Sequence, residues 1–403
     1  MNTPAHIVVA GAGAAGLGTA EALRRKGYRG ELTVIGAETH PPYDRPPLSK
    51  QVLSGAWEPI RCHLRSPEAL STTDAEFVLG DPAARLDAVA RTVHTSSGRV
   101  LRGDAVVIAT GLRPRMLPGQ SALAGVHSLR TLDDAMALRT DLLTASRLVV
   151  VGEGVLGAEI AATARGMGVD VTVAGPQSAP MLGQLGPAAA KLLALLHNEN
   201  GVRLRLGTGV AGLVGADGRV TGVRTDSGEL LPADVVVVAI GADPVTEWLA
   251  GSGLTLDDGV VCDLRCRAAE GVYAVGDVAR VRDERSGVTR RLENRTNATE
   301  QAGAAADAIL DIERPGRPLS YFWTEQFGTR IHVYGALPAD AKVSIVDGDP
   351  TAGRFVAEYH RAGEVTGVLG WNMPKQARIR GQRIAAAESG LAPDEPAALA
   401  APP

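Results

Sequence analysis

Two segments of the chain repeat one order of apolar and polar positions. In the first, apolar residues 6–10 precede a glycine-rich turn, a helical pattern over 14–26 and a second apolar run over 31–35. The same order recurs over 147–174, with the helix expected at 158–168. Short apolar runs on both sides of a helix are typical of a βαβ unit with parallel strands. We therefore predict an α/β protein with two doubly wound dinucleotide-binding domains.

Three further apolar runs end in a small residue followed by glycine. Because ligands bind at the carboxyl ends of parallel strands, small residues there let a cofactor approach the backbone. After residue 317 apolar and polar positions alternate, which indicates a small α+β domain, and the end of the chain lacks periodicity and is expected to be disordered. The runs lie at 105–111, 235–241 and 271–277. The predicted division is a discontinuous first domain (1–112 and 242–317), a second domain (113–241), a C-terminal domain (318–390) and a tail (391–403).

Composition narrows the class of protein. A net charge of −4 argues against a nucleic-acid partner, and three cysteines are too few for a disulfide framework. The longest apolar run, 235–241, is far shorter than a membrane span, and no targeting signal precedes the first run. We expect a cytoplasmic protein without a membrane segment. Glycine supplies 48 of the 403 residues, so the positions of the glycines carry information.

The first glycine-rich turn, GAGAAG, has the spacing of a dinucleotide fingerprint. Gly11 allows a tight turn, Gly13 lets a pyrophosphate approach the backbone, and Gly16 lets the helix pack on the strand. Glu38 follows Gly16 by 22 positions, where a ribose hydroxyl needs an acceptor. The alternative is a turn in an α/β protein that holds no cofactor.

The second turn, GEGVLG, places Gly152, Gly154 and Gly157 at the same spacing but departs from the pattern twice. Glu153 lies inside the phosphate turn. Residues 174–177 read AGPQ where a ribose-binding acid is expected, and they include no Arg or Lys for a 2′-phosphate. We expect this turn to bind a nicotinamide nucleotide, and the choice between NADH and NADPH stays open.

Motifs along nearly the whole chain resemble the flavin-dependent ferredoxin reductases that serve bacterial oxygenases, which are related to apoptosis-inducing factor. The resemblance implies a domain for non-covalent FAD, a domain for NAD(P)H and a small C-terminal domain. The motifs, in chain order, are GAGAAG, YDRPPLSK, ATGLRPR, LRTLDDA, GEGVLG, YAVGDVA, NATEQA and YFWTEQ.

The resemblance assigns residues to the flavin site. It places the pyrophosphate on the first turn, the ribityl or phosphate end against a Gly-Asp pair, and an arginine against the FAD phosphate. These residues are Gly11, Gly13, Ala15 and Gly16 for the turn, Gly276 and Asp277 for the pair, Arg130 for the phosphate, Thr110 and Gly111 beside the flavin, Ala83 near the adenosine, and Arg45 of the YDRPPLSK segment.

Two flavin-site positions depart from the family. Ala37 stands where the family has its adenosine-ribose acid, so Glu38 must substitute or the contact is lost. Arg295 replaces a flavin-side Val or Trp. A cation there would raise the flavin's potential by favouring the anionic reduced form.

Lys50 is the residue that the resemblance assigns to chemistry. In the family this lysine lies near flavin N5 and pairs with a glutamate just after the second turn, here Glu159. A buried ammonium needs such a partner. Trp323 resembles the tryptophan that covers the flavin. The alternatives are an exposed lysine after a turn and a tryptophan of the C-terminal core.

Some chemistry has no support in the sequence. A disulfide reductase needs a cysteine just after the second strand, and HPPYDRPPLSKQ has none. We interpret Cys62, Cys262 and Cys266 as ordinary thiols. The histidines are scattered without ligand spacing, so no metal site is predicted, and no GxSxG elbow is present.

The predicted activity is hydride transfer from NAD(P)H to FAD and single-electron transfer to a two-iron ferredoxin. That ferredoxin would supply a haem-thiolate monooxygenase or a ring-hydroxylating oxygenase. The alternatives are an NADH oxidase or peroxide-type flavoprotein, and a signalling flavoprotein resembling apoptosis-inducing factor. An acidic ferredoxin needs local positive charge, although solvated charged faces are common. The candidate charges are Lys375, Arg378, Arg380 and Arg383, or Arg290 and Arg291.

Overall fold

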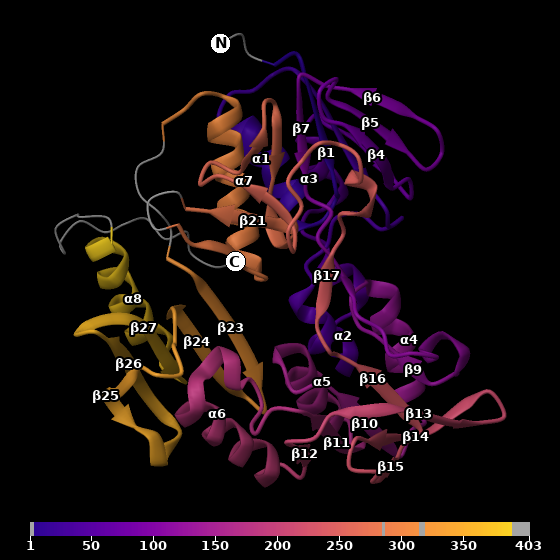
Figure 1. Ribbon diagram of the computed structural model, residues 1–403, viewed down its shortest axis with the longest axis vertical. Helices are drawn as coiled ribbons and strands as arrows, with labels where there is room; N and C mark the ends of the chain where they lie inside the picture. The colour runs from indigo at the N-terminus through magenta and orange to yellow at the C-terminus, as the bar shows by residue number, and fades with distance from the viewer. Residues whose placement is uncertain (1–3, 284–286, 314–318, 389–403) are drawn as a thin grey trace. The chain divides into compact units, whose positions relative to one another are not determined.

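The computed structural model describes residues 4–283, 287–313 and 319–388 (Figure 1). The chain divides into two compact units, each containing one of the two βαβ motifs. Unit 1 is Met1–Asp44, Ile60–Arg113 and Ala242–Gly316, and unit 2 is Arg45–Pro59, Pro114–Gly241 and Arg317–Pro403. The predicted tail, 391–403, lies outside the described residues, and the predicted domain boundaries stay a prediction.

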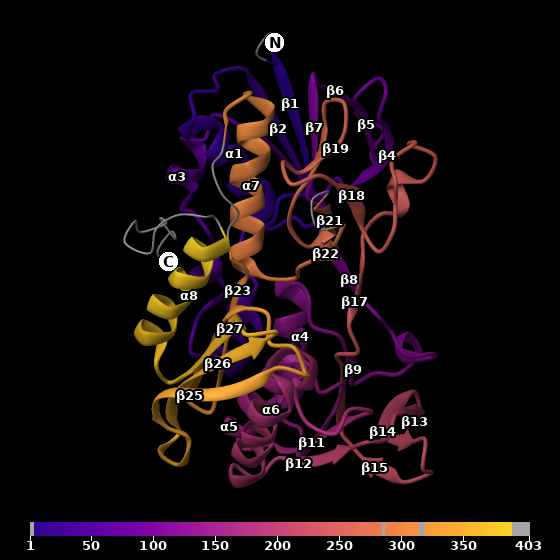
Figure 2. The same ribbon diagram turned by 60° about the vertical axis from the view of Figure 1, so that its left-hand side comes forward.

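Unit 1 is built on a six-stranded sheet in the order β19-β20-β7-β1-β2-β3, parallel except for β19. Helices α1 and α7 lie side by side on one face, as Figure 2 shows. Alternate side chains of β1 serve the two faces, because Ile7 and Val9 pack with the helices and Val8 with the opposite core. The bounds are β1 (His6–Ala10), α1 (Ala14–Arg25), β2 (Glu31–Gly36), β3 (Glu76–Leu79), β7 (Ala105–Ile108), β19 (Arg267–Ala269), β20 (Val272–Ala274) and α7 (Arg295–Ile309).

Smaller elements complete unit 1. An antiparallel sheet, β4-β5-β6, joins the core opposite the helices, and a third sheet has the order β18-β21-β22. Strands β8 and β17 pair where the chain leaves and re-enters the unit. The bounds are η2 (Pro59–Cys62), α3 (Pro67–Ser71), β4 (Ala83–Asp87), β5 (Thr92–Thr95), β6 (Val100–Arg102), β8 (Leu112–Pro114), β17 (Ala242–Pro244), η4 (Glu247–Leu249), β18 (Val260–Cys262), η5 (Gly276–Val278), β21 (Ala279–Arg282) and β22 (Thr289–Arg291).

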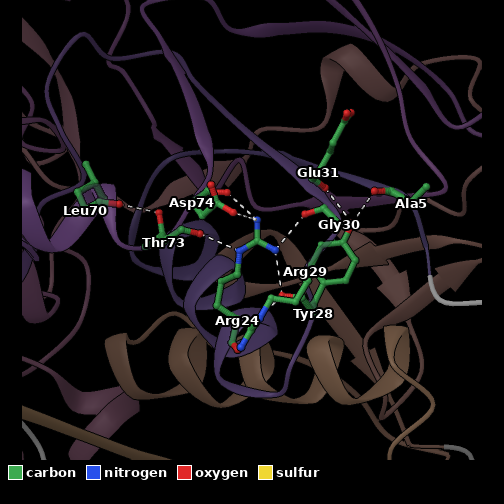
Figure 3. A network of polar contacts seen from close by, with 9 residues as sticks. All are labelled: Ala5, Arg24, Tyr28, Arg29, Gly30, Glu31, Leu70, Thr73 and Asp74. Carbon is green, nitrogen blue, oxygen red and sulfur yellow. Dashed lines mark hydrogen bonds and ion pairs between the residues drawn. The ribbon is translucent and has the colours of Figure 1, made fainter.

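The guanidinium of Arg24 fastens the C-terminal end of α1 to its neighbours (Figure 3). It donates to the carbonyl oxygens of Thr73 and Asp74, at 2.8 and 2.6 Å, and to those of Tyr28 and Gly30, both at 3.0 Å. The Tyr28 hydroxyl donates in turn to the Glu31 carbonyl, at 2.8 Å. One planar donor group therefore satisfies four loop carbonyls and closes the first βαβ motif.

Unit 2 contains a five-stranded parallel sheet in the order β12-β11-β10-β16-β9. A hairpin-like sheet, β13-β14-β15, packs against it. The bounds are η1 (Pro46–Ser49), α2 (Gln51–Ser54), η3 (Gln120–Ala122), β9 (Val126–His127), α4 (Leu132–Leu142), β10 (Arg147–Val151), α5 (Val155–Gly166), β11 (Asp170–Gly175), α6 (Leu182–Glu199), β12 (Arg203–Leu206), β13 (Val210–Ala216), β14 (Arg219–Thr225), β15 (Leu230–Pro232) and β16 (Val235–Val238).

The C-terminal part of unit 2 is an antiparallel sheet, β23-β24-β27-β26-β25, between two helices. Apolar residues of α6 fill one face, where the Tyr359 hydroxyl donates to the Leu185 carbonyl at 2.8 Å. Helix α8 covers the other face. The bounds are β23 (Tyr321–Gln326), β24 (Thr329–Gly335), β25 (Lys342–Asp349), η6 (Pro350–Ala352), β26 (Arg354–Arg361), β27 (Glu364–Trp371) and α8 (Pro374–Glu388).

The predicted fold class, two doubly wound domains with a small α+β domain, is confirmed. The predicted start of the second helix at 158 is wrong, because Gly154 is the N-cap and α5 begins at Val155. Apolar spacing alone does not show that the last residues of GEGVLG already belong to the helix. The strands of the Gly-ending runs stop before the glycines, at Ile108, Val238 and Ala274.

Candidate functional site

The first glycine turn, after β1, forms a cradle that side chains would fill. Gly11 has a φ of +125°, and a Cβ there would lie 2.1 Å from the Ala109 carbonyl oxygen. A Cβ on Gly16 would lie 1.8 Å from the Gly11 carbonyl oxygen. Gly13 is the N-cap of α1, and none of the described residues comes within 4 Å of a Cβ placed on it. The turn therefore offers an open approach to the first amides of a helix, which suits a diphosphate.

The Gly-Asp turn lies against the start of the same helix. Gly276 has a φ of +75°, and a Cβ on it would lie 2.8 Å from the Cβ of Ala15. The Gly276 N–H donates to the Gln301 Oε1 at 2.7 Å, which ties the turn to α7. Asp277 follows in η5. The structure thus brings the predicted pyrophosphate loop and the predicted Gly-Asp acceptor together in unit 1.

Glu38, Ala37 and Ala83 lie beyond the carboxyl end of β2. The Tyr43 hydroxyl donates to a Glu38 carboxylate oxygen. The loop after β3 bonds back to this region, because the Gly80 N–H donates to the Glu38 carbonyl at 3.0 Å, and Ala83 opens β4 shortly after it. Ala37 is exposed. An acid is therefore present at this strand end, one residue later than in the family pattern.

Arg295 is not an isolated cation. Its Nε donates to Asp44 Oδ1 at 2.7 Å, and its Nη1 donates to the Thr299 hydroxyl. The carboxylate offsets part of the guanidinium charge, and the effect of Arg295 on the flavin's potential stays a prediction. Thr110 and Gly111 follow β7, where the Thr110 hydroxyl donates to the Val245 carbonyl at 2.8 Å.

The second glycine turn repeats the geometry of the first. Gly152 has a φ of +114°, and a Cβ there would lie 2.2 Å from the Ala239 carbonyl oxygen. A Cβ on Gly157 would lie 2.0 Å from the Gly152 carbonyl oxygen. No described residue comes within 4 Å of a Cβ on Gly154, the N-cap of α5. Unit 2 therefore carries its own open cradle at a helix N-terminus.

A buried polar cluster joins Lys50 to α5 of the second βαβ motif. The Lys50 ammonium lies 2.6 Å from Glu159 Oε2, and the two side chains are 14% and 7% exposed. The Ser49 hydroxyl donates to the same oxygen at 2.6 Å, and the Thr324 hydroxyl donates to Oε1 at 2.7 Å. Lys50 is thus not an exposed lysine after a turn. A buried ammonium with a fully hydrogen-bonded carboxylate beside it is held in one orientation.

Sequence reasoning missed Ser49 and Thr324. Ser49 precedes the lysine in RPPLSK, and Thr324 follows Trp323 in YFWTEQ, so both stood within quoted motifs. The period-two alternation of β23 is the signal that separates Trp323 from Thr324, because successive side chains point to opposite faces. Thr324 faces α5.

The other predicted flavin-site residues of unit 2 lie in two places. Arg45 donates to the Arg130 carbonyl, and the Arg130 N–H donates to Asp134 Oδ2 at 2.9 Å, at the capping box that starts α4. Trp323 is half-buried and stacks on Tyr321 with 5.9 Å between ring centroids. It is only partly buried where it packs against the C-terminal core.

The three thiols are buried. Burial, with a smaller contribution from the Asp44 charge, raises the pKa of Cys62 to about 11. Burial also raises the pKa of Cys262 well above its usual range. Because the thiolate is the reactive form, these thiols are poor nucleophiles near neutral pH. Among the described residues, no cluster of His, Cys, Asp and Glu has the arrangement of a metal site.

Comparisons with known proteins identify the family to which the chain belongs. Residues 5–302 match the family described as pyridine nucleotide-disulphide oxidoreductase, and residues 321–402 match the reductase C-terminal family. The chain belongs to the pyridine nucleotide-disulphide oxidoreductase family. Its members use FAD and NAD(P)H, and the two open glycine cradles fit two dinucleotides. None of the described helices is long and apolar enough to span a membrane.

Several proteins named as reductases are similar over most of the chain. Rhodocoxin reductase of Rhodococcus erythropolis is 36% identical over 393 residues, 97% of this chain and 92% of the relative. The ferredoxin–NAD(+) reductase subunit of the benzene 1,2-dioxygenase system of Pseudomonas putida is 40% identical over 82% of this chain and 80% of the relative. Putidaredoxin reductase, in its covalent complex with putidaredoxin, superposes with a TM-score of 0.90 at 31% identity, covering 95% and 94% of the two chains.

Proposed function

We propose that this protein is an NAD(P)H-dependent ferredoxin reductase that takes a hydride from NAD(P)H onto FAD and passes single electrons to a ferredoxin. The observation that carries the proposal is the presence of two equivalent open cradles, one in each unit, on a chain that also holds a buried Lys–Glu pair. A protein that binds two dinucleotides and whose three cysteines are all buried moves electrons through its cofactors.

The bound flavin supplies the chemistry of accepting two electrons and releasing them singly, which side chains do not provide. The residues of the chain bind and orient. The first amides of α1 and α5 would hold the two diphosphates, and the glycines keep the approach to these amides open. The ammonium of Lys50 is held in a fixed place by Glu159. The carboxylate of Glu159 is itself fixed by hydrogen bonds from Ser49 and Thr324.

The partner follows from the relatives. Relatives named for benzene and chlorobenzene dioxygenase systems and for putidaredoxin reduction are similar over most of the chain. We propose a two-iron ferredoxin as acceptor, with a haem-thiolate monooxygenase or a ring-hydroxylating oxygenase downstream. We also propose that the protein works in the cytoplasm, where thiols such as its three stay reduced.

The exposed face of α8 is the better of the two predicted docking patches. Lys375, Arg378 and Arg383 are exposed there, whereas Arg380 pairs with Glu358 at 2.8 Å. The second patch loses Arg291, which pairs with Asp258 and Glu293 and is 10% exposed. Among the described residues no carboxylate pairs with these three charges, which favours an acidic partner at this face.

The alternatives differ from this proposal in turnover. A peroxide-type flavoprotein needs a reactive thiolate, which the raised pKa values of Cys62 and Cys262 disfavour. A signalling flavoprotein would be reduced slowly and would not pass electrons quickly to any ferredoxin.

Stopped-flow reduction of the holoprotein by NADH and by NADPH, followed by cytochrome c reduction with and without putidaredoxin, tests the proposal. We expect the flavin to be reduced at least as fast as the enzyme turns over. We also expect the added two-iron protein to increase the rate of cytochrome c reduction strongly. Cytochrome c reduction that does not respond to putidaredoxin or to any other two-iron ferredoxin would overturn the proposal. Fast direct reduction of oxygen or peroxide would favour the oxidase alternative.

A further inference from the structure

Glu153 places a buried carboxylate inside the second glycine turn. Its side chain is only 5% exposed although it lies between two glycines of a phosphate-binding turn. Oε1 accepts a hydrogen bond from the Gln177 N–H at 3.1 Å, just beyond the end of β11. Among the described residues Oε2 has no hydrogen-bond partner. This oxygen is accessible to solvent, so a hydroxyl of a bound ligand can take the place of water as its donor.

The carboxylate of Glu153 fills the place that a side chain at Gly175 would take. A Cβ built on Gly175 would lie 1.6 Å from Glu153 Oε2 and 2.5 Å from its carboxyl carbon. Gly175 is the last residue of β11. The end of this strand is where a dinucleotide-binding fold holds the acid that accepts the ribose 2′-hydroxyl. The carboxylate is therefore at the strand end, although its backbone belongs to the loop.

The first βαβ motif shows what the arrangement replaces. Gly36 ends β2 as Gly175 ends β11, and the two strand ends have the same register. The Gly11 N–H donates to the carbonyl of Ile35, the residue before Gly36, at 2.8 Å. The Gly152 N–H donates to the carbonyl of Ala174, the residue before Gly175, also at 2.8 Å. The loop position facing Gly36 is Ala12, whose Cβ would lie 2.7 Å from a Cβ there. The acid of that motif, Glu38, comes from beyond the strand.

We propose that Glu153 is the residue that accepts the adenosine ribose hydroxyls of the nicotinamide nucleotide and makes the second site selective for NADH over NADPH. The free Oε2 is the acceptor. A 2′-phosphate would meet a buried carboxylate and, in residues 174–177, no Arg or Lys to balance it. The inference rests on the proposed function only in taking the second cradle as the nicotinamide nucleotide site.

The selectivity can be measured without any electron transfer. Calorimetric titration of the flavin-loaded protein with ADP-ribose and with 2′-phospho-ADP-ribose reads the ribose contact alone. We expect the native protein to bind ADP-ribose at least tenfold more tightly, about the scale of one hydrogen bond to a charged acceptor. Glu153→Gln keeps the size of the side chain and removes its charge, and it should cut this ratio by about tenfold.

Moving the acid from position 153 to position 175 tests whether the two side chains compete for the same space. Gly175→Glu alone puts two carboxylates into one place and should abolish binding of both probes. The double variant Glu153→Gly with Gly175→Glu moves the acid to the strand end and should restore the preference for ADP-ribose. Glu199→Gln, at the exposed end of α6, is the matched control and should leave both affinities unchanged. Flavin retention together with an unchanged circular dichroism spectrum shows that each variant is folded.

Two results would overturn the inference: equal affinity of the native protein for the two probes, or a ratio that Glu153→Gln does not change. Selective binding of ADP-ribose by a protein that reduces no ferredoxin would remove the proposed function and leave this inference standing. Rapid ferredoxin reduction by a protein that does not distinguish the probes would do the reverse.

Discussion

The two βαβ motifs share a backbone and differ in the side chains placed around it. Gly11 and Gly152 have φ values of +125° and +114° and face a carbonyl oxygen at nearly the same distance. Around these equal turns the first motif has Ala12 in the loop and the acid Glu38 beyond the strand, whereas the second has Glu153 in the loop and no acid over 174–177. The glycines therefore define where a diphosphate binds, and the residues between and beyond them decide which nucleotide it belongs to.

The helices that follow the turns differ as well. Gly18 of α1 lies where α7 packs closely, with a Cβ position 3.4 Å from Ala302. The equivalent position of α5 is Glu159, which reaches out to Lys50. The helix α1 thus uses this position for packing, and α5 uses it for a buried charge. The two motifs therefore share a backbone arrangement but not the same functional side chains.

The largest expected effects test whether the two glycine turns, which share a backbone geometry, bind different ligands. Gly16→Ala and Gly157→Ala each drive a methyl group into a carbonyl oxygen, at 1.8 and 2.0 Å. We expect Gly16→Ala to lose most of its flavin, because strain of a few kcal/mol falls on the diphosphate cradle. Gly157→Ala should keep its flavin and lose affinity for NADH by more than tenfold.

Flavin absorbance per chain and NADH titration measure these two losses. Gly166→Ala, at the end of α5 with no neighbour of its Cβ among the described residues, should behave as the native protein. Loss of flavin from both Gly16→Ala and Gly157→Ala would contradict the separation of the two cradles.

Removal of the charge on Glu159 tests the difference between α1 and α5. In Glu159→Gln, Lys50 loses its partner in a buried setting and its ammonium is no longer held. Flavin reduction by NADH should slow by roughly a hundredfold, the scale of a misplaced reacting group. Stopped-flow kinetics measures the rate. Thr324→Ser, which keeps the hydroxyl that donates to Glu159, should slow the reaction only slightly, and an equal loss in both variants would point to general disruption.

Acid should weaken unit 2 before unit 1. Burial lowers the pKa of His197 and of His332, both in unit 2, so their neutral forms are favoured in the folded state. Stability held this way is present above the unfolded pKa near 6.5 and is lost as the pH falls below it. In unit 1, hydrogen bonds from the His6 and Ala5 amides lower the pKa of Asp104, and that stability is lost only near pH 4 and below.

Hydrogen exchange between pH 7 and pH 5, corrected for intrinsic rates, separates the two units. Protection of β24 should fall while protection of β1 is kept. His197→Gln removes one titrating group and should flatten the pH dependence of unit 2. A parallel loss of protection in both strands would show that the units unfold together.

The smallest effect compares a basic surface patch in each unit. Lys375→Glu with Arg378→Glu should raise the KM for ferredoxin several-fold at low salt and leave NADH-to-dye activity intact, because rim charges act mainly on association. Arg290→Glu in unit 1 should change it less. Arg380 is a poor choice for this test, since reversal there would face Glu358. Equal KM values for all variants at low salt would remove α8 from the docking surface.

Much of the fold followed from local patterns, and the site followed only in part. Strand–turn–helix order predicts both nucleotide motifs, because glycine spacing and apolar runs are local signals. The contact of Thr324 with Glu159 joins residues 165 positions apart, and only the packing of β23 beside α5 creates it. The pairing of Arg295 with Asp44 is equally non-local. The sequence therefore indicated the arginine but not the carboxylate that pairs with it.

The space shared by Glu153 and Gly175 constrains how such a chain changes over generations. The two residues are far apart in sequence, yet only one of them has room for a carboxylate. A glutamate gained at 175 while Glu153 remains collides with it, and a glycine gained at 153 first leaves the ribose without an acceptor. Every single-step path between the two placements therefore passes through a weaker binder, which makes the position of the acid hard to reverse once it has moved into the loop.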